Sequence, residues 1–155
     1  MHAKSLSIIL LAIILSTSCS MLNVSYRHQQ QYFPKQLAKL YLGMPFQNFQ
    51  KIKNIPEMKI FDDFDFRTEY TEFFSEGEIE EITYYFTKGN SGILYEFIIK
   101  YAPDFDIHNF SFQKYGKHNA GDEWLFDSKS GFDMMIWIFE TKLVIAGKIP
   151  GSGWE

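Results

Sequence analysis

FDFRTEYTEFFSEGEIEEITYYFTKGNSGILYEFIIKY, residues 64–101, decides the fold of this chain. Apolar and polar side chains alternate along three runs within it, residues 64–74, 79–87 and 93–101. A period of two is typical of strands that bury one face. Short links that contain glycine join the runs, and short links favour pairing between neighbours in the chain, so the stretch predicts a three-stranded antiparallel meander.

The alternation also predicts which side chains share a face. In the first run they are Phe64, Phe66, Thr68, Tyr70 and Phe74. In the third run they are Ile93, Tyr95, Phe97, Ile99 and Tyr101. We expect helices to cover one face of the resulting sheet.

A short helix is predicted before the meander. It begins at Pro45, a residue that suits the first helical position, and continues to about Lys53. Its apolar side is formed by Phe46, Phe49 and Ile52, which recur every three residues.

A second helix is predicted after the meander. It begins at Asp104 or Asp106, which suit the N-cap, and ends at Gly116. One side of it is formed by Phe105, His108, Phe112 and Tyr115. Three further strands follow, residues 123–127, 132–140 and 143–149.

This order of elements predicts an α+β fold, an antiparallel β-sheet of about six strands with two short helices packed on one face. Residues 48–52 (NFQKI) resemble residues 111–115 (SFQKY), and each set precedes a meander. The likeness indicates either a duplication or two unrelated helices of similar composition.

The composition of the 155-residue chain predicts one domain that folds without disulfides or metals. Hydrophobic residues make up 46% of it and aromatic residues 18%, which is ample apolar area for a core. The formal net charge is -4, and removal of Lys4 with a leader would make it -5. A negative charge disfavours a phosphate-binding surface, so nucleic acid is excluded as an expected partner.

The first 18 residues have the parts of a secretory leader. A short basic start with His2 and Lys4 precedes an apolar run over residues 6–15, and three small residues then lead to Cys19. As a helix the run would cover about 15 Å, half the thickness of a bilayer core. Residues 1–18 are therefore predicted to be a signal peptide rather than a membrane span.

Cys19 is the only cysteine, so it cannot form a disulfide within the chain. The stretch Leu15-Ser16-Thr17-Ser18-Cys19 resembles the lipobox of bacterial lipoproteins, in which the cysteine receives diacylglycerol before cleavage. Leu15 lies four rather than three residues before the cysteine, which is similar to the looser lipoboxes of spirochetes. The resemblance implies lipidation of Cys19. Ordinary leader cleavage at the same bond is the alternative.

The chain after the leader is predicted to comprise a tether and one domain. Residues 19–33 lack a sustained apolar period and include three consecutive glutamines, so a lipidated cysteine followed by a flexible tether is expected there. A single α+β domain is expected over residues 34–155. Ser20, rather than aspartate, follows the cysteine, and this resembles lipoproteins that are delivered to the outer membrane rather than kept at the inner one.

The segment Leu40-Tyr41-Leu42-Gly43-Met44-Pro45, followed by a short helix, resembles the Gly-Met turn of the small SmpA-type outer-membrane lipoproteins and of the related β-lactamase-inhibitor-protein-like domains. The likeness covers residues 37–55. It implies helices packed on an antiparallel sheet and a function in binding other proteins, and it implies no particular partner-binding residue.

The chain contains no Gly-rich phosphate loop, paired cysteines, HExxH motif or Gly-x-Ser-x-Gly elbow. His118, Asp122 and Glu123 are close enough in sequence to form a metal or proton-transfer site, although a solvated loop is the commoner arrangement. Asp62, Asp63 and Asp65 offer oxygen ligands for calcium, but the glycine and distal glutamate of an EF-hand loop are missing, which favours a solvated loop. No metal and no cofactor is expected.

Aromatic side chains near the end of the chain raise two further questions. Trp124, Trp137 and Phe139 either line a ligand pocket or belong to the sheet core, and alternating aromatics in strands are more often core. The glycine-rich tail, residues 150–155, contains Trp154, which we expect to dock on the domain rather than to await a partner.

The sequence thus predicts a lipid-anchored, non-catalytic protein-interaction module of the bacterial cell envelope, with the outer membrane favoured and with an envelope protein as partner. One alternative is a small-ligand-binding or enzyme-inhibitor domain that uses a face of the sheet. A second is a hydrolase around His118 and Asp122.

Overall fold

The computed structural model describes residues 27–62, 64–89 and 92–154. The predicted signal peptide, residues 1–18, and the predicted lipidation site Cys19 lie outside the described residues.

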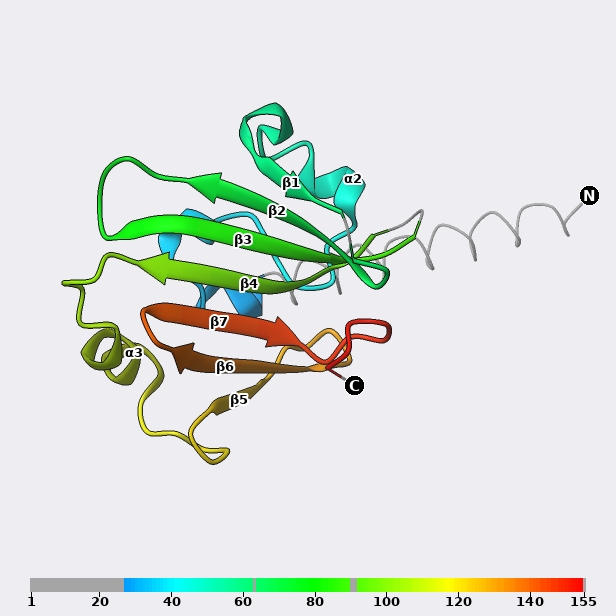
Figure 1. The fold of residues 1–155 in the computed structure, drawn as a ribbon. Helices are drawn as coiled ribbons and strands as arrows, with labels where there is room; N and C mark the ends of the chain where they lie inside the picture. The colour runs from blue at the N-terminus through cyan, green and yellow to red at the C-terminus, as the bar shows by residue number, and fades with distance from the viewer. Residues whose placement is uncertain (1–26, 63, 90–91, 155) are drawn as a thin grey trace, which may run out of the picture.

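The predicted α+β class is confirmed. One open antiparallel sheet has the strand order β1-β2-β3-β4-β7-β6-β5 (Figure 1). Its strands are β1 (Lys59–Phe61), β2 (Arg67–Phe73), β3 (Ile79–Thr87), β4 (Leu94–Tyr101), β5 (Trp124–Asp127), β6 (Asp133–Phe139) and β7 (Lys142–Gly147). The six predicted strands are all present. Strand β1 was not predicted, because its three residues are all exposed and too few to show a period.

The helices are short: α2 (Phe46–Phe49), α3 (Ile107–Tyr115) and the 3-10 turns η1 (Lys35–Leu37) and η2 (Ile55–Glu57). The Gly-Met turn that the sequence predicted before α2 fixes the position of this helix. Gly43 adopts a φ of +89°, which favours glycine, and its N–H donates to the carbonyl of Leu94 at 2.8 Å. The Leu94 N–H donates back to the carbonyl of Met44 at 2.9 Å. The start of α2 is thereby fixed to the start of β4.

The prediction for α3 is right in its ends, and of the four residues predicted to share a side, Phe105 and Tyr115 pack against the core. Asp106 caps the helix by accepting a hydrogen bond from the N–H of Asn109 at 3.0 Å, and Gly116 follows the last helical residue. The buried positions are Ile107 and Ser111, whereas the predicted His108 and Phe112 are exposed. Aromatic residues occupy both sides of this helix, so its apolar period did not identify one side.

The two faces of the sheet differ in what covers them. Residues 27–45, blue in Figure 1, pass behind β3 and β4. The face behind, here called the covered face, contains a row of side chains from five neighbouring strands, each fully buried: Tyr84, Phe97, Ile145, Ile136 and Trp124. Among the residues that the structure describes, no helix lies in front of the other face, here called the open face (Figure 1).

Residues 27–33 belong to the folded body, so the body starts before Pro34, where the domain was predicted to begin. Residues 27–30 are helical. Gln29 is fully buried, and its side-chain amide accepts a hydrogen bond from the N–H of Leu42 at 2.8 Å and donates to the carbonyl of Leu42 at 3.3 Å. The ring of Phe33 meets that of Phe97 at 5.2 Å. This segment was predicted to be a flexible tether, but Gln29 satisfies buried backbone groups of Leu42 instead.

The sheet consists of two similar halves. Strands β2 to β4 follow α2, strands β5 to β7 follow α3, and β4 pairs with β7 in the middle. A duplication would produce this arrangement, as would two unrelated meanders joined at their last strands.

Candidate interaction surface

A β-bulge in β4 places two consecutive side chains on the open face. Tyr85 pairs with Glu96 whereas Phe86 pairs with Leu94, so Tyr95 is the extra residue. The rings of Tyr95 and Tyr85 lie 6.3 Å apart. The prediction that Tyr95 shares a face with Phe97 and Ile99 is therefore wrong, because the bulge interrupts the alternation.

The segment after β7 folds back over this part of the open face. Gly151 and Gly153 both adopt a φ of +81°, which turns the chain twice. Nε1 of Trp154 donates a hydrogen bond to Oε2 of Glu96 at 2.9 Å. The indole also meets the ring of Trp137 edge-on at a centroid distance of 5.3 Å. The predicted docking of the tail is confirmed.

Glu96 is a buried acid, with 6% of its surface exposed. Burial raises the pKa of its carboxyl, and the hydrogen bond from Trp154 opposes that effect only in part. Tyr85 and Tyr95 are also buried, which raises the pKa of each hydroxyl to about 12. Both hydroxyls therefore stay protonated at neutral pH.

Arg67 extends this cluster across β2. Its guanidinium carbon lies 4.6 Å from the ring centre of Tyr85 and 4.5 Å from that of Phe64. Nε donates to Oε1 of Glu69 at 2.6 Å. Stacking and ion pairing together hold the planar guanidinium in place, and arginines of this kind are frequent at protein interfaces.

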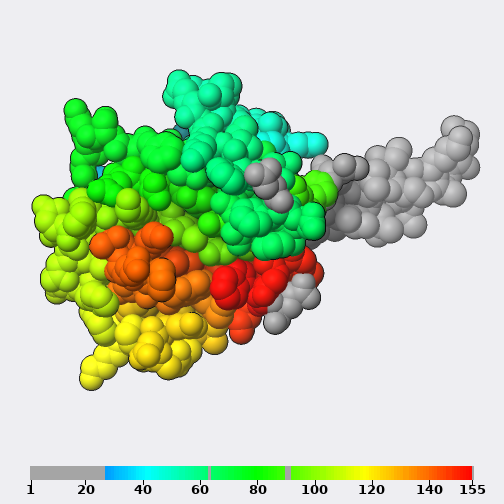
Figure 2. All heavy atoms as spheres, viewed as in Figure 1, coloured from blue at the N-terminus to red at the C-terminus, as the bar shows by residue number. Residues whose placement is uncertain are grey.

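Large apolar side chains are exposed on the open face. They are Phe61, Phe73, Phe139 and Trp154. Phe73 and Phe139 are 59% and 56% exposed. Charged side chains lie between them, including the ion pair of Lys100 and Glu80 at 2.8 Å. In Figure 2, which has the same view as Figure 1, the strands and the red tail form the visible surface.

The predicted metal or proton-transfer site is not assembled in the described part of the chain. The ring of His118 packs against those of Trp124 and Phe112, at centroid distances of 4.2 and 4.9 Å. No hydrogen bond or ion pair of the described residues joins it to Asp122 or Glu123, and Asp122 is exposed. No cluster of three or more histidine, cysteine, aspartate or glutamate side chains in residues 27–62, 64–89 and 92–154 is suited to hold a metal.

The predicted calcium ligands also have other roles or lie elsewhere. Oδ1 of Asp62 accepts hydrogen bonds from Nζ of Lys88 and Oγ1 of Thr68, both at 2.5 Å. Both bonds lower the pKa of the Asp62 carboxyl, and the bond from Lys88 has the larger effect. Asp65 is exposed, and Asp63 lies outside the described residues. Lysine thus supplies the positive charge next to Asp62.

The three aromatic residues considered for a ligand pocket lie on two faces. Trp124 pairs with Ile136 on the covered face and is fully buried. Trp137, the next residue in β6, lies on the open face with the exposed Phe139. They therefore do not line one pocket.

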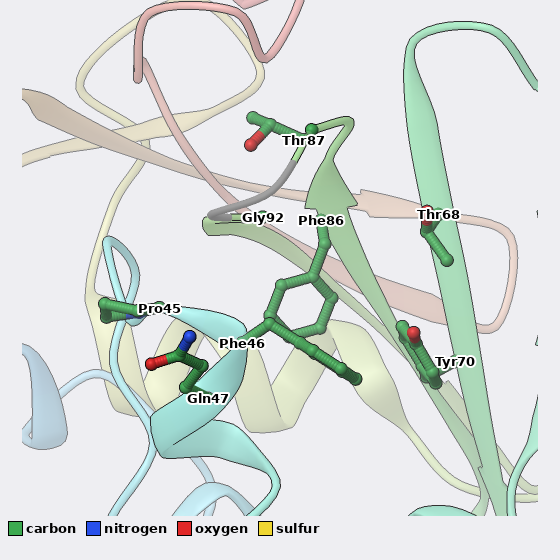
Figure 3. Close-up of a pocket in the computed structure, with 9 residues that line it drawn as sticks. Pro45, Phe46, Gln47, Thr68, Tyr70, Phe86, Thr87 and Gly92 are labelled. Carbon is green, nitrogen blue, oxygen red and sulfur yellow. The ribbon is translucent and has the colours of Figure 1, made fainter.

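A cavity of about 200 Å³ lies between α2 and the edge of the covered face (Figure 3). Phe46 stacks on Tyr70 at 4.8 Å and meets Phe86 at 5.2 Å, which gives the cavity aromatic walls. Gln47, Thr68 and Thr87 add polar atoms at its rim. The described residues that line it include no charged side chain.

Comparison with protein-family models, with curated proteins and with solved structures finds no match to this chain. The resemblances to the lipobox and to the SmpA-type lipoproteins therefore stay predictions. Among the described residues, no helix has the length and apolar character needed to cross a membrane.

Proposed function

We propose that this chain is a bacterial lipoprotein anchored by lipid on Cys19 and that its folded body is a non-catalytic protein-interaction module of the cell envelope. The leader pattern that precedes Cys19 supports the anchor. The outer membrane is the proposed location, because Ser20 rather than aspartate follows the cysteine. An envelope protein is the proposed partner.

Lipidation would make the attachment durable. Each methylene buried in the bilayer contributes about 0.8 kcal/mol, and two or three acyl chains together resist dissociation, whereas one chain binds only marginally. Attachment at Cys19 would leave the whole folded body outside the bilayer.

The open face carries the proposal of an interaction module. Aromatic side chains and a stacked arginine are enriched at protein interfaces, and the open face presents Phe73, Phe139, Trp154 and Arg67. Phe73 lies in β2 and Phe139 in β6, and each strand is hydrogen-bonded to its neighbours in the sheet, so the backbone positions of both residues are fixed before a partner binds. Little ordering entropy would then oppose association.

Mass spectrometry of the protein recovered from bacterial membranes tests the anchor. We expect a mature chain that begins at Cys19 and carries the mass of a diacylglyceryl group. The Cys19→Ser variant is the matched control, because it keeps the small residues that ordinary cleavage needs and should be released from the membrane. An unmodified Cys19 at the mature terminus would refute the anchor.

Site-specific crosslinking in native membranes tests the interaction surface. A photo-reactive residue at Phe73 or at Phe139 should capture the same envelope protein. The same residue at Phe112 is the control, since this side chain is 42% exposed but contacts Trp124 of the covered face. Capture of the same protein from Phe112, or of none from the other two positions, would contradict the proposal.

A small-ligand-binding domain is the second candidate. The covered face is filled by buried side chains of residues 27–58, such as Phe33 and Phe49, so a ligand there has to bind in a cavity at the margin of this face. One such cavity, beside η1 and α3, is lined by the apolar side chains of Phe33, Ile79 and Phe110 and by the charged side chains of Lys35 and Lys114, and this observation favours the second candidate at that place.

A further inference from the structure

The described chain enters the body at one end of the sheet. The register places the starts of β2, β4 and β6 beside the ends of β3, β5 and β7, at the right in Figure 1, and this end is here called the entry end. Nε2 of His28 donates to the carbonyl of Asp127, the last residue of β5, at 2.9 Å. Nε2 of Gln29 donates to Oγ of Ser130, in the next turn, at 3.2 Å. The chain before Arg27 therefore joins the body at the entry end.

Exposed apolar side chains gather in the segment that leads into β2. Residues 60–66 contain four of the nine large apolar side chains that are exposed in the described part of the chain: Ile60, Phe61, Phe64 and Phe66. Phe66 directly precedes β2 and is 54% exposed, and Phe64 is 36% exposed. Exposed apolar patches on soluble proteins mark sites that contact a protein or a membrane.

The rings of Phe64 and Phe66 are held in this exposed position. The N–H of Lys88, just after β3, donates to the carbonyl of Phe66 at 3.2 Å, which fixes the segment to the entry end. The guanidinium carbon of Arg67 lies 4.5 Å from the ring centre of Phe64 and 5.1 Å from that of Phe66. The two ring centres are 5.9 Å apart. The fold thus presents both rings to the surroundings as a pair.

Acids and bases offset each other at the entry end. Asp62 forms an ion pair with Lys88, and Asp127 forms one with Lys129 at 2.6 Å. Two further acids and two further bases are exposed there: Asp65, Asp133, Arg27 and Lys148. The charges of these described residues sum to zero, so they do not repel an anionic lipid surface.

The chain before the body is short. Seven residues, 20–26, separate Cys19 from Arg27. Because an extended chain covers at most about 3.6 Å per residue, these residues reach no further than about 25 Å. If Cys19 carries the lipid, the body is held close to the membrane, and the entry end is the part of it to which the anchor leads.

We propose that the entry end faces the membrane and that the rings of Phe64 and Phe66 rest at the boundary between the lipid headgroups and the acyl chains. This inference rests on the proposed lipid anchor at Cys19. Apolar rings at that boundary are removed from water, and the anchor brings them there without a further loss of translational freedom. The strands stay outside the bilayer, and the open face, which runs along the sheet, stays accessible to a partner.

Fluorescent labels show which end of the sheet faces the lipid. The lipidated protein is placed in vesicles of phosphatidylethanolamine and phosphatidylglycerol that contain a nitroxide lipid as quencher. Because acylation occupies the thiol of Cys19, the cysteine of Phe66→Cys is the only free one and takes the label. Phe73→Cys is the matched control, since Phe73 is 59% exposed and ends β2, roughly 20 Å from its start. Since interfacial groups lie within about 10 Å of the boundary, quenching at position 66 should be roughly threefold stronger.

The outcomes separate the proposal from the anchor on which it rests. Equally weak quenching at both positions would overturn the proposal, and protection of position 66 in native membranes alone would then assign the rings to a protein partner. Equally strong quenching would mean that the open face lies flat on the lipid, which also overturns it. If Cys19 carries no lipid, the unchanged protein takes the label, so failure of the anchor is recognised separately.

Vesicle binding without the anchor measures the contribution of the rings alone. The Cys19→Ser chain should bind the same vesicles weakly at high lipid concentration. Adding Phe64→Ser and Phe66→Ser should lower its partition roughly tenfold, whereas adding Phe73→Ser should leave the partition unchanged. Circular dichroism checks that the variants fold alike. If the two sets of variants partition alike, the rings do not contact lipid, even where mass spectrometry confirms the lipid on Cys19.

Discussion

The same strands form the covered face and the open face, yet the two faces carry different types of side chain. Two neighbouring rows across the sheet, one on each face, show the difference. The covered row through Phe97 is wholly apolar or aromatic and fully buried. The neighbouring open row contains Glu69, Tyr85 and Glu96, and a returning tail shields its buried acid. Core packing accounts for the first row. The second places charge and aromatic rings where the fold alone does not require them, so this face is the better candidate for recognition.

Truncation of one phenylalanine on each face gives the largest expected contrast. Phe97→Ala removes a fully buried ring that contacts Phe33 and Tyr84, and it should lower the free energy of unfolding by about 3–5 kcal/mol. Phe73→Ala removes a ring that is 59% exposed and should change it by less than about 0.5 kcal/mol. Urea unfolding followed by circular dichroism measures both. Similar losses would show that the open face also stabilises the fold.

The second largest expected change in the free energy of unfolding comes from residues 27–33, which pack behind the covered face. Gln29→Ala leaves the N–H and the carbonyl of Leu42 without their side-chain partner, so the free energy of unfolding should fall by roughly 2–4 kcal/mol. Gln31→Ala is the control, because Gln31 is exposed and its amide forms a hydrogen bond with the ring of His28 rather than with a buried backbone group. Equal stability of the two variants, measured in the same urea titration, would place the start of the stable body after Gln29.

These contrasts also show why the sequence predicted some features and not others. The strands were predictable because each has several residues in strict alternation, and buried faces enforce that period. Local patterns carry no record of partners far away in the chain. The polar composition around Gln29 was therefore interpreted as a flexible tether, although the N–H of Leu42, thirteen residues later, donates a hydrogen bond to that side chain.

The candidate surface was predictable in part. A large aromatic residue on a glycine-rich tail predicted the docking of Trp154, but its receiving group was not recognised. Glu96 is the only charged residue in the otherwise apolar run of residues 93–99, and a lone acid in such a run is a signal of a buried carboxylate. The bulge at Tyr95 had no such signal, because no glycine or proline marks it.

Removal of the docked indole tests how much the tail contributes to the open face. Trp154→Ala loses the hydrogen bond to Glu96 and the contact with Trp137, so the free energy of unfolding should fall by about 1–2 kcal/mol. Trp154→Phe keeps an aromatic ring and loses the N–H donor, so its free energy of unfolding should lie between those of Trp154→Ala and the unchanged protein. If Trp154→Ala unfolds at the same urea concentration as the unchanged protein, docking adds no stability.

The pH dependence of stability is the smallest expected effect. It shows whether the tail or the strands of the sheet bury Glu96. Because the pKa of its carboxyl is raised in the folded state, the folded state binds the proton more tightly than the unfolded state does. The resulting stabilisation is present below pH 4.5, the ordinary value, and is lost as the pH rises through the raised pKa. Relative to Glu96→Gln, the protein should therefore lose stability as the pH rises above 4.5 in urea titrations at each pH. In Trp154→Ala the loss should be smaller, because water reaches the carboxyl; an unchanged loss would mean that the strands, and not the tail, bury it.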